Sequence, residues 1–286
     1  MKGEASAPGA ATVVNAIATL KGSAFAVDLR THATVELDES AAGVDGTTDV
    51  DVDTTLIETC VEKTVARFGI EAGGTVETTT EIPPESGLKS SSAAANATVL
   101  ATLDALGETD TLEPLETALV GVEAARDAGV TITGALDDAT ASALGGVVLT
   151  DNSSDELLHR EPFDRSVAVY VPDERAPSAS TDVGRSKLVA PVVERAFDMA
   201  RDGDYADGMT TNGFAYCAAL RRDASPAVDA LAHAEGAGLS GTGPSFAAIG
   251  DTEDIQEVAK DWKKLDGKVL RPETDNRGAS TNSAKR

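Results

Sequence analysis

The chain has 286 residues, with 48 Asp and Glu against 24 Lys and Arg, so its formal net charge is -24. This imbalance argues against a nucleic-acid partner, because phosphate neutralisation needs clustered Lys and Arg, and against an anionic membrane surface. No apolar run approaches the length of about 18 residues that a membrane-spanning helix needs. Because 41% of the residues are hydrophobic and recur periodically, we expect a folded protein with one large domain or two small ones.

The acidic residues are spread along the whole chain, for example in residues 49–53 and 201–208. We expect a cytoplasmic protein from a high-salt organism, since molar salt shortens the Debye length to about 3 Å and screens the self-repulsion. Cys60 and Cys217 lie far apart and outside any CxxC pair. They predict two buried thiols in a reducing cytoplasm rather than a disulfide or a zinc site.

Hydrophobic spacing, taken in chain order, predicts a mixture of strands and helices. The elements predicted in the first half are strands over 24–29 and 33–37, a helix over 56–68, a strand over 75–82, and helices over 92–106 and 112–128. Those predicted in the second half are a strand over 166–171, helices over 188–201, 205–220 and 226–235, a strand over 244–249 and a helix over 253–264. A polar loop covers residues 172–184, and the polar tail 272–286 is expected to be frayed.

Strands and helices follow one another without a regular β-α alternation, which predicts an α+β fold rather than a doubly wound parallel sheet. We expect the domain junction between residues 150 and 165. The predicted domains are residues 1–155 and residues 156–286.

One short loop carries the most chemical information. A strand stops at the pair Pro83-Pro84, Gly87 turns the chain, and three serines open an Ala-rich helix. Open N–H groups and the positive end of the helix dipole form an anion site, and serine hydroxyls can ligate Mg²⁺. Lys89 adds a positive charge. The alternative is a serine-capped helix that binds nothing.

A second loop, residues 236–245, has four glycines and three hydroxyl side chains within ten residues. Glycine lets the backbone approach a ligand closely, whereas the alternative is an ordinary turn before the next strand. The presence of two such loops in one chain favours nucleotide binding.

Residues 83–93 (PPESGLKSSSA) resemble the second motif of the GHMP kinases, the family of galactokinase, homoserine kinase and mevalonate kinase. Residues 236–245 resemble the third motif and residues 6–15 the first, in the family's order. Residues 22–25, 134–139 and 209–213 are most similar to the archaeal type of shikimate kinase. The resemblance implies a two-lobed α+β fold with the nucleotide site between the lobes, ATP and Mg²⁺ as cofactors, and transfer of the γ-phosphate to the 3-hydroxyl of shikimate.

The resemblance also implies which residues surround the nucleotide. The implied ATP-binding residues are Pro84, Glu85, Ser86, Gly87, Leu88, Lys89, Ser90, Ser91, Ser92, Gly241, Thr242 and Gly243. Ser91 is the first choice as a Mg²⁺ ligand, with Ser90 and Ser92 as alternatives.

For catalysis, the acceptor hydroxyl needs a base or an orienting carboxylate. In mevalonate kinases and galactokinases an Asp precedes a glycine by seven residues, and Asp138 stands in this relation to Gly145. Asp138 is therefore the first choice as the catalytic carboxylate and Asp137 the second. The alternative is that both aspartates only cap and stabilise the first turn of a helix. The first motif departs from the family, because small or neutral residues stand where many members carry Lys, Glu and His. These residues are Ala10, Asn15 and Ala16.

The carboxylate of shikimate requires an Arg or Lys partner. The basic candidates are Lys21, Arg160, Arg165 and Arg185. Thr210 and Asn212 are candidates for binding substrate hydroxyls, and the alternative for that segment is a turn.

Three functional hypotheses follow. The first is a kinase that phosphorylates shikimate, and the second keeps the chemistry but uses homoserine or a mevalonate-type alcohol. The third is a nucleotide-binding regulator without catalysis. The oligomeric state stays open.

Overall fold

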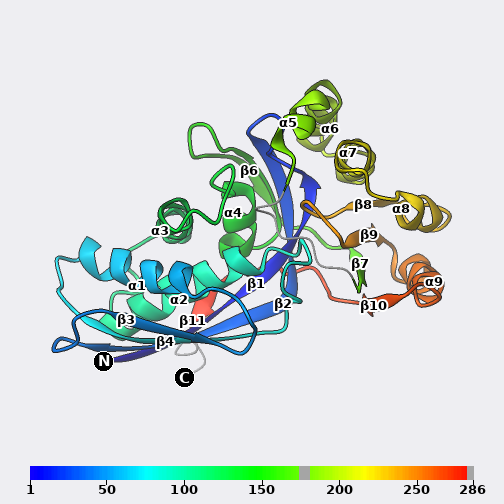
Figure 1. The fold of residues 1–286 in the computed structure, drawn as a ribbon. Helices are drawn as coiled ribbons and strands as arrows, with labels where there is room; N and C mark the ends of the chain where they lie inside the picture. The colour runs from blue at the N-terminus through cyan, green and yellow to red at the C-terminus, as the bar shows by residue number, and fades with distance from the viewer. Residues whose placement is uncertain (174–180, 282–286) are drawn as a thin grey trace.

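A computed structural model describes residues 1–173 and 181–281 (Figure 1). Two sheets form the framework. A seven-stranded sheet has the order β11-β1-β2-β4-β3, with β5 added beside β2 and β6 beside β5, and a four-stranded sheet has the order β10-β7-β9-β8. Antiparallel pairs dominate both sheets, and this arrangement confirms the α+β class. Most of the predicted polar loop over 172–184 lies outside the described residues.

The two longest strands, β1 (Lys2–Val14) and β2 (Lys21–Asp38), form the spine of the larger sheet. The sequence predicted two separate strands where β2 runs without a break. Its first half pairs with β5 and its second half with β4. The polar residues 30–32, which interrupt the hydrophobic pattern, pair with β1, and a register shift between Pro8 and Gly9 leaves only Asp28 and Leu29 outside that ladder. The bulge therefore bends the strand without ending it.

Helices cover one face of the larger sheet (Figure 1). These helices are α1 (Thr55–Arg67), α2 (Ser90–Leu106), α3 (Pro114–Asp127) and α4 (Leu136–Leu144). Besides β1, β2 and β11, the larger sheet contains β3 (Val44–Thr48), β4 (Gly73–Thr80), β5 (Val147–Asp151) and β6 (Glu156–Glu161). Alanines let α2 lie close to β1, and a Cβ on Gly3 would come within 2.1 Å of the Ala101 carbonyl oxygen.

The smaller sheet carries the second lobe. Its strands are β7 (Ser166–Pro172), β8 (Gly236–Leu239), β9 (Phe246–Gly250) and β10 (Gly267–Leu270). Its helices are α5 (Val183–Leu188), α6 (Ala190–Arg201), α7 (Tyr205–Leu220), α8 (Ser225–Ala230) and α9 (Thr252–Trp262). The largest hydrophobic cluster joins Phe25 of β2 to Ile249 and Trp262, so one core continues across both sheets.

The prediction of a frayed tail is wrong for residues 272–281. This segment returns to the first lobe, where β11 (Ser280–Thr281) pairs with Ala5 and Ser6 of β1. The Arg30 Nη1 atom lies 2.6 Å from the buried Asp275 carboxylate. The polarity that suggested fraying is satisfied inside the protein instead.

The chain passes from one sheet to the other between Glu161 and Ser166, because β6 still pairs with β5. We propose that the domain junction lies there, inside the expected 150–165 stretch and a few residues after the expected 155/156 division. The segment containing β11 then belongs to the first lobe.

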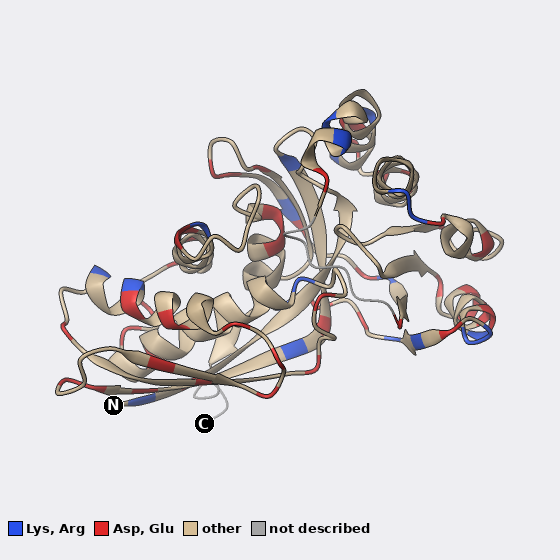
Figure 2. Cartoon of the chain, viewed as in Figure 1, with Lys and Arg blue, Asp and Glu red and all other residues tan. Residues whose placement is uncertain are grey.

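Three further observations bear on the predictions from composition. Asp and Glu are distributed over both lobes (Figure 2). Cys60 and Cys217 are free and buried, as predicted. Within the residues described, no helix has the length and apolar character that a membrane span needs.

Candidate active site

The glycine-serine loop ends in an unusual backbone conformation. Lys89, directly before α2, is left-handed (φ 65°, ψ 34°), and its side chain does not cap the helix. The first-turn N–H groups of an α-helix have no partner inside the helix, so they are available to an anion. Gly87 has φ +88°, and a Cβ there would lie 2.3 Å from the Ser240 carbonyl oxygen. Only glycine allows this approach.

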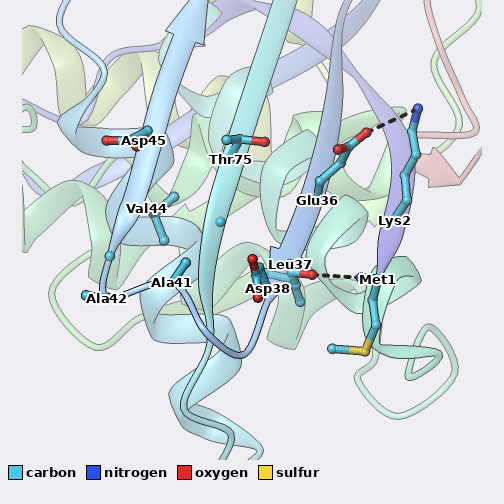
Figure 3. A pocket seen from close by; sticks show the side chains of 12 residues that line it. Met1, Lys2, Glu36, Leu37, Asp38, Ala41, Ala42, Val44, Asp45 and Thr75 are labelled. Atoms are coloured by element: carbon cyan, nitrogen blue, oxygen red, sulfur yellow. Dashed lines mark hydrogen bonds and ion pairs between the residues drawn. The ribbon is translucent and has the colours of Figure 1, made fainter.

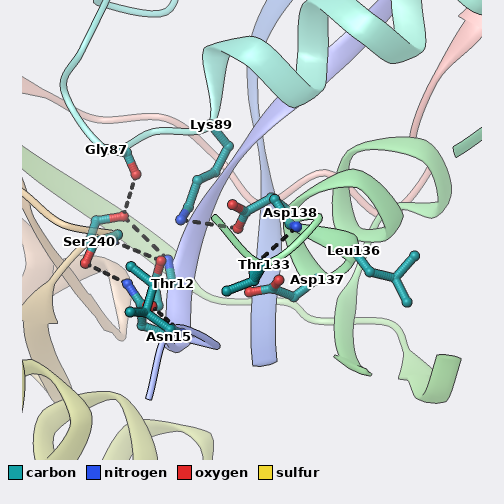
Figure 4. A network of polar contacts seen from close by, with 12 residues as sticks. Thr12, Asn15, Gly87, Lys89, Thr133, Leu136, Asp137, Asp138 and Ser240 are labelled. Carbon is teal, nitrogen blue, oxygen red and sulfur yellow. Dashed lines mark hydrogen bonds and ion pairs between the residues drawn. The ribbon is translucent and has the colours of Figure 1, made fainter. Parts of the chain in front are cut away.

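The two small-residue loops lie against each other (Figure 4). The Ser240 hydroxyl donates to the Gly87 carbonyl at 2.9 Å, and the Ser245 N–H donates to the Ser86 carbonyl at 3.2 Å. A Cβ on Gly241 would be 3.1 Å from the Lys89 Nζ atom. The second and third motif segments therefore form one continuous surface around the start of α2.

The end of β1 completes this junction. The Thr12 hydroxyl accepts from the Gly241 N–H at 2.8 Å, and the Thr12 N–H donates to the Ser240 hydroxyl at 3.3 Å. The Asn15 amide donates to the Gly241 carbonyl at 2.9 Å. All three motif segments thus meet at one place, although they are separated by most of the chain.

Asp138, in the first turn of α4, faces this junction (Figure 4). Its Oδ1 atom lies 3.0 Å from Lys89 Nζ, and the two side chains are only 15% and 10% exposed. Within the described part of the chain, Oδ1 is buried without a well-oriented hydrogen bond. This oxygen therefore retains capacity for a further partner.

Asp137 packs against β2 instead. It is 3% exposed, and a Cβ on Gly22 would come within 2.5 Å of its Cγ atom. Its Oδ1 atom accepts a hydrogen bond from the Asn152 amide at 3.0 Å. Burial, and then the charge of Asp138, raise the pKa of Asp137 to about 7, while Lys89 and the Asn152 hydrogen bond oppose that rise. The two neighbouring aspartates thus occupy different environments.

The predicted acceptor residues separate into two groups. Asn212 is fully buried beside the first motif segment, where its Oδ1 atom accepts from the Asn15 N–H at 3.1 Å. Its Nδ2 group has no hydrogen-bond partner among the residues that the structure describes. Thr210 is engaged elsewhere, because its hydroxyl donates to the Ala206 carbonyl at 2.9 Å and accepts from the Ala237 N–H at 3.1 Å. Both lie inside α7, so the segment is helix and not the turn considered as an alternative.

The four basic candidates also differ. Arg160 donates to the carbonyl groups of Leu144 and Asn276 at 3.0 and 2.8 Å, among others, and so joins the end of α4 to the C-terminal segment. Arg185 donates to the Ala219 carbonyl of α7 at 2.7 Å, and Arg165 pairs with Glu235 at 3.0 Å. The side chains of all three arginines are therefore engaged in hydrogen bonds or an ion pair with other protein groups.

Lys21 is exposed at the start of β2, where its ammonium group lies 5.8 Å from the centre of the Phe197 ring. It forms no ion pair in the described chain. Of the four basic candidates, Lys21 is therefore the one that is not committed to a protein hydrogen bond or ion pair among the described residues.

Two contributors to the site escaped sequence reasoning. The Tyr216 hydroxyl accepts from the Ala18 N–H at 3.0 Å and donates to the Asn15 carbonyl at 3.2 Å, which fixes the chain after β1. Asn152 holds Asp137, as described above. A single sequence offers no pattern that links either residue to a site more than ten positions away.

A surface depression lies apart from this junction, beside the N-terminus (Figure 3). Lys2 and Glu36 line it and pair with each other at 3.8 Å, and the Met1 ammonium donates to the Leu37 carbonyl at 2.7 Å. The two positive charges in its lining are therefore already engaged by protein groups.

Known proteins of similar sequence align with almost the whole length of this chain. A shikimate kinase of Halobacterium salinarum is 51% identical over 283 residues, which are 98% of this chain and 100% of that protein. A shikimate kinase of Methanosarcina mazei is 49% identical over 284 residues, covering 98% and 96% of the two chains. The family model "GHMP kinases N terminal domain" matches residues 55–146, which contain the glycine-serine loop and both aspartates. The chain belongs to the GHMP kinase family. These relatives also confirm the resemblance to archaeal-type shikimate kinases, and family membership makes the chain an ATP-dependent small-molecule kinase.

Among solved structures, homoserine kinase from Cytophaga hutchinsonii has a TM-score of 0.76 at 18% identity, covering 98% of this chain and 97% of that one. Mevalonate kinase from Methanococcus jannaschii has a TM-score of 0.76 at 15% identity, with 96% and 98% covered. These structures confirm the GHMP kinase-like fold.

Proposed function

We propose that the chain is a shikimate kinase, which transfers the γ-phosphate of ATP to the 3-hydroxyl of shikimate. The observation that carries the chemistry is the Lys89–Asp138 pair at the place where the three motif segments meet. Shikimate is supported as the acceptor by the relatives named shikimate kinase, which share about half of their residues with this chain over nearly its full length. Homoserine and mevalonate kinases share the fold at much lower identity, so they support no competing acceptor.

The phosphate site of the proposal is built from the two loops. The residues assigned to ATP are Pro84, Glu85, Ser86, Gly87, Leu88, Lys89, Ser90, Ser91, Ser92, Gly241, Thr242 and Gly243. The open N–H groups at the start of α2 and the Lys89 ammonium would neutralise the triphosphate, and such positioning and neutralisation supply most of the catalysis of phosphoryl transfer.

The residues around Lys89 also fit Mg²⁺. The described residues contain no cluster of three His, Cys, Asp or Glu side chains, and Mg²⁺ with nucleotides characteristically takes one or two protein oxygens besides phosphates and waters. Ser91 would be the protein ligand, with Ser90 and Ser92 as alternatives, and the bound ion would offset phosphate charge. The buried Ser245 hydroxyl without a partner in the described chain agrees with a polar ligand nearby.

Asp138 would orient the acceptor hydroxyl and take its proton while the phosphoryl group passes to that oxygen and ADP departs. The Lys89 ammonium lies 3.0 Å from the Asp138 carboxylate and would hold it beside the acceptor hydroxyl. Asp137 is the alternative base, since burial and the neighbouring Asp138 charge raise its pKa above that of an ordinary carboxyl group. Asp138 is preferred as the base, because Asp137 is buried and packs against Gly22.

For the acceptor, Lys21 would bind the carboxylate and the free Asn212 amide a ring hydroxyl. Arg160 and Thr210 are omitted, because protein groups already occupy their side chains. The proposal also includes a cytoplasmic, high-salt setting, which suits the net charge of -24 and the two free cysteines.

The test is ADP release with shikimate, homoserine and mevalonate as separate acceptors, in molar KCl with Mg²⁺ and ATP. Turnover with shikimate and none with the other two is the expected result. Turnover with another alcohol instead would replace the acceptor, and ATP binding without turnover on any alcohol would favour a regulator.

A further inference from the structure

A buried polar chain lies behind the two aspartates, on the side of β5. Thr150 is fully buried in β5, and Asn152, which follows that strand, is 5% exposed. The Thr150 hydroxyl donates to Asn152 Oδ1 at 2.7 Å, and Asn152 Nδ2 donates to Asp137 Oδ1 at 3.0 Å. Three polar side chains in a row thus lead from the sheet to the first turn of α4.

Thr150 determines which way the Asn152 amide faces. The carbonyl end of that amide takes the Thr150 hydroxyl proton, so the NH₂ end is directed at Asp137. The same NH₂ group lies 3.4 Å from the Thr133 hydroxyl, in the loop before α4. With both ends of the amide occupied, Asn152 cannot rotate without losing buried hydrogen bonds.

Asn152 also contacts the acceptor side of the site. Its N–H donates to the Leu20 carbonyl at 2.7 Å, directly before Lys21. Lys21 is paired with Asp151 in the β2–β5 ladder. One residue therefore connects the segment that carries Lys21 to the helix that carries Asp138.

We propose that Asn152, oriented by Thr150, is a positioning residue for phosphoryl transfer: its amide seats Asp137 against β2 and so places the adjacent Asp138 beside Lys89. This inference rests on the proposed function. Asn152 touches neither Lys89 nor the glycine-serine loop through any hydrogen bond of the described residues, so it acts through Asp137.

The charges around Asp137 make this role measurable. Asp138 lies in its own helix, Lys89 precedes α2, Tyr216 reaches it from α7, and Lys21 and Asp151 stand at the adjoining strand ends. The Asn152 hydrogen bond lowers the pKa of Asp137 against the effect of burial. Without that donor the pKa of Asp137 rises further, so Asp137 becomes neutral at a higher pH. Because the proposal needs the charged Asp137 carboxylate to hold the start of α4 and thus Asp138, the acid limb of kcat moves upward with it.

The experiment measures kcat, the KM for each substrate and the pH profile of Asn152→Leu with shikimate as acceptor. We expect kcat to fall about tenfold or more, since a hydrogen bond to a charged group is lost, while the KM for ATP stays near wild type. The acid limb is expected to move to higher pH.

Asn276→Leu is the matched control, because the Asn276 amide also holds a backbone group, accepting from the Phe163 N–H at 2.7 Å in a partly buried contact, but lies in the C-terminal segment. It should lower thermal stability without moving the acid limb. Thr150→Val should reproduce the Asn152→Leu effect in weaker form, and Thr150→Ser should restore wild-type behaviour because it keeps the hydroxyl.

Wild-type kcat and an unmoved acid limb in Asn152→Leu would overturn the inference while leaving the proposed function intact. If Asn152→Leu fails to fold, Thr150→Val and Thr150→Ser decide: equal kcat and equal pH profiles in both would reject the role. Absence of shikimate turnover in the wild type would instead reject the proposed function.

Discussion

Arg30–Asp275 and Lys89–Asp138 each join a basic side chain to an aspartate from a distant segment, at 2.6 and 3.0 Å. The first pair is 17% and 2% exposed, and the second 10% and 15%. Both therefore remove opposite charges from water to a similar degree. They differ in what surrounds those charges.

The Arg30–Asp275 pair is saturated. The Arg30 guanidinium also donates to the Ser6 hydroxyl at 3.1 Å and to the Gly278 carbonyl at 2.9 Å. Asp275 Oδ1 accepts from the N–H groups of Arg277 and Gly278 at 2.7 and 2.9 Å. A buried pair contributes to stability only when such additional bonds satisfy its remaining donors and acceptors.

The Lys89–Asp138 pair lacks that support. Asp138 Oδ1 makes no well-oriented hydrogen bond in the part of the chain described, and the backbone N–H groups beside Lys89 are open. The contrast teaches that saturation, rather than burial, separates a structural ion pair from one that is available to a ligand.

The largest expected effect is the loss of catalysis in the Asp138→Asn variant. We expect kcat to fall about a thousandfold, since a positioned base contributes factors of this order, with KM for ATP little changed. The measurement is ADP release with shikimate in molar KCl. A kcat near wild type would show that Asp138 is not the base. The Asp137→Asn variant would then show whether Asp137 has that role or neither aspartate does.

The same substitution at the saturated pair, Asp275→Asn, is expected to act on stability instead. It leaves the partly buried Arg30 charge without its counterion, which costs about 3 kcal/mol of unfolding free energy. Denaturant unfolding at constant KCl measures this loss, and kcat below the transition should match wild type. A kcat loss like that of Asp138→Asn would erase the distinction between the two pairs.

Lys21→Met tests the free cation on the acceptor side. We expect the KM for shikimate to rise about tenfold, because one charge-assisted contact to its carboxylate is lost, while the KM for ATP is unchanged. Arg165→Met is the control, since Arg165 pairs with Glu235 on the surface and should leave both constants unaltered. An unchanged KM for shikimate in Lys21→Met would remove Lys21 from the acceptor site.

The smallest effect per residue is that of salt, which acts on all charges together. With a net charge of -24, the melting temperature should rise from dilute to molar KCl as self-repulsion is screened. A thermal melting series measures the trend. A flat or falling series would reject the high-salt interpretation, and the Asp275→Asn variant should keep its deficit at every salt concentration because its charge pair is buried.

The sequence alone was sufficient for the α+β class, the helices over α1, α2 and α3, and the motif segments, because hydrophobic spacing and glycine-serine loops are local signals. The motif resemblance named the family for the same reason. Local signals also misled: residues 236–239 were assigned to a loop but form β8, and β1 escaped prediction because its Ala, Gly and Ser residues resemble no isolated strand.

Only the tertiary structure decided how these segments are used. The ordered C-terminal segment, the different surroundings of Asp137 and Asp138, and the commitment of Arg160 to main-chain carbonyls all depend on contacts between distant residues. The Asn152 amide reaches Asp137 only because β5 pairs with β2. A sequence lists which charges exist, whereas the folded packing determines which of them are neutralised and which remain for a substrate.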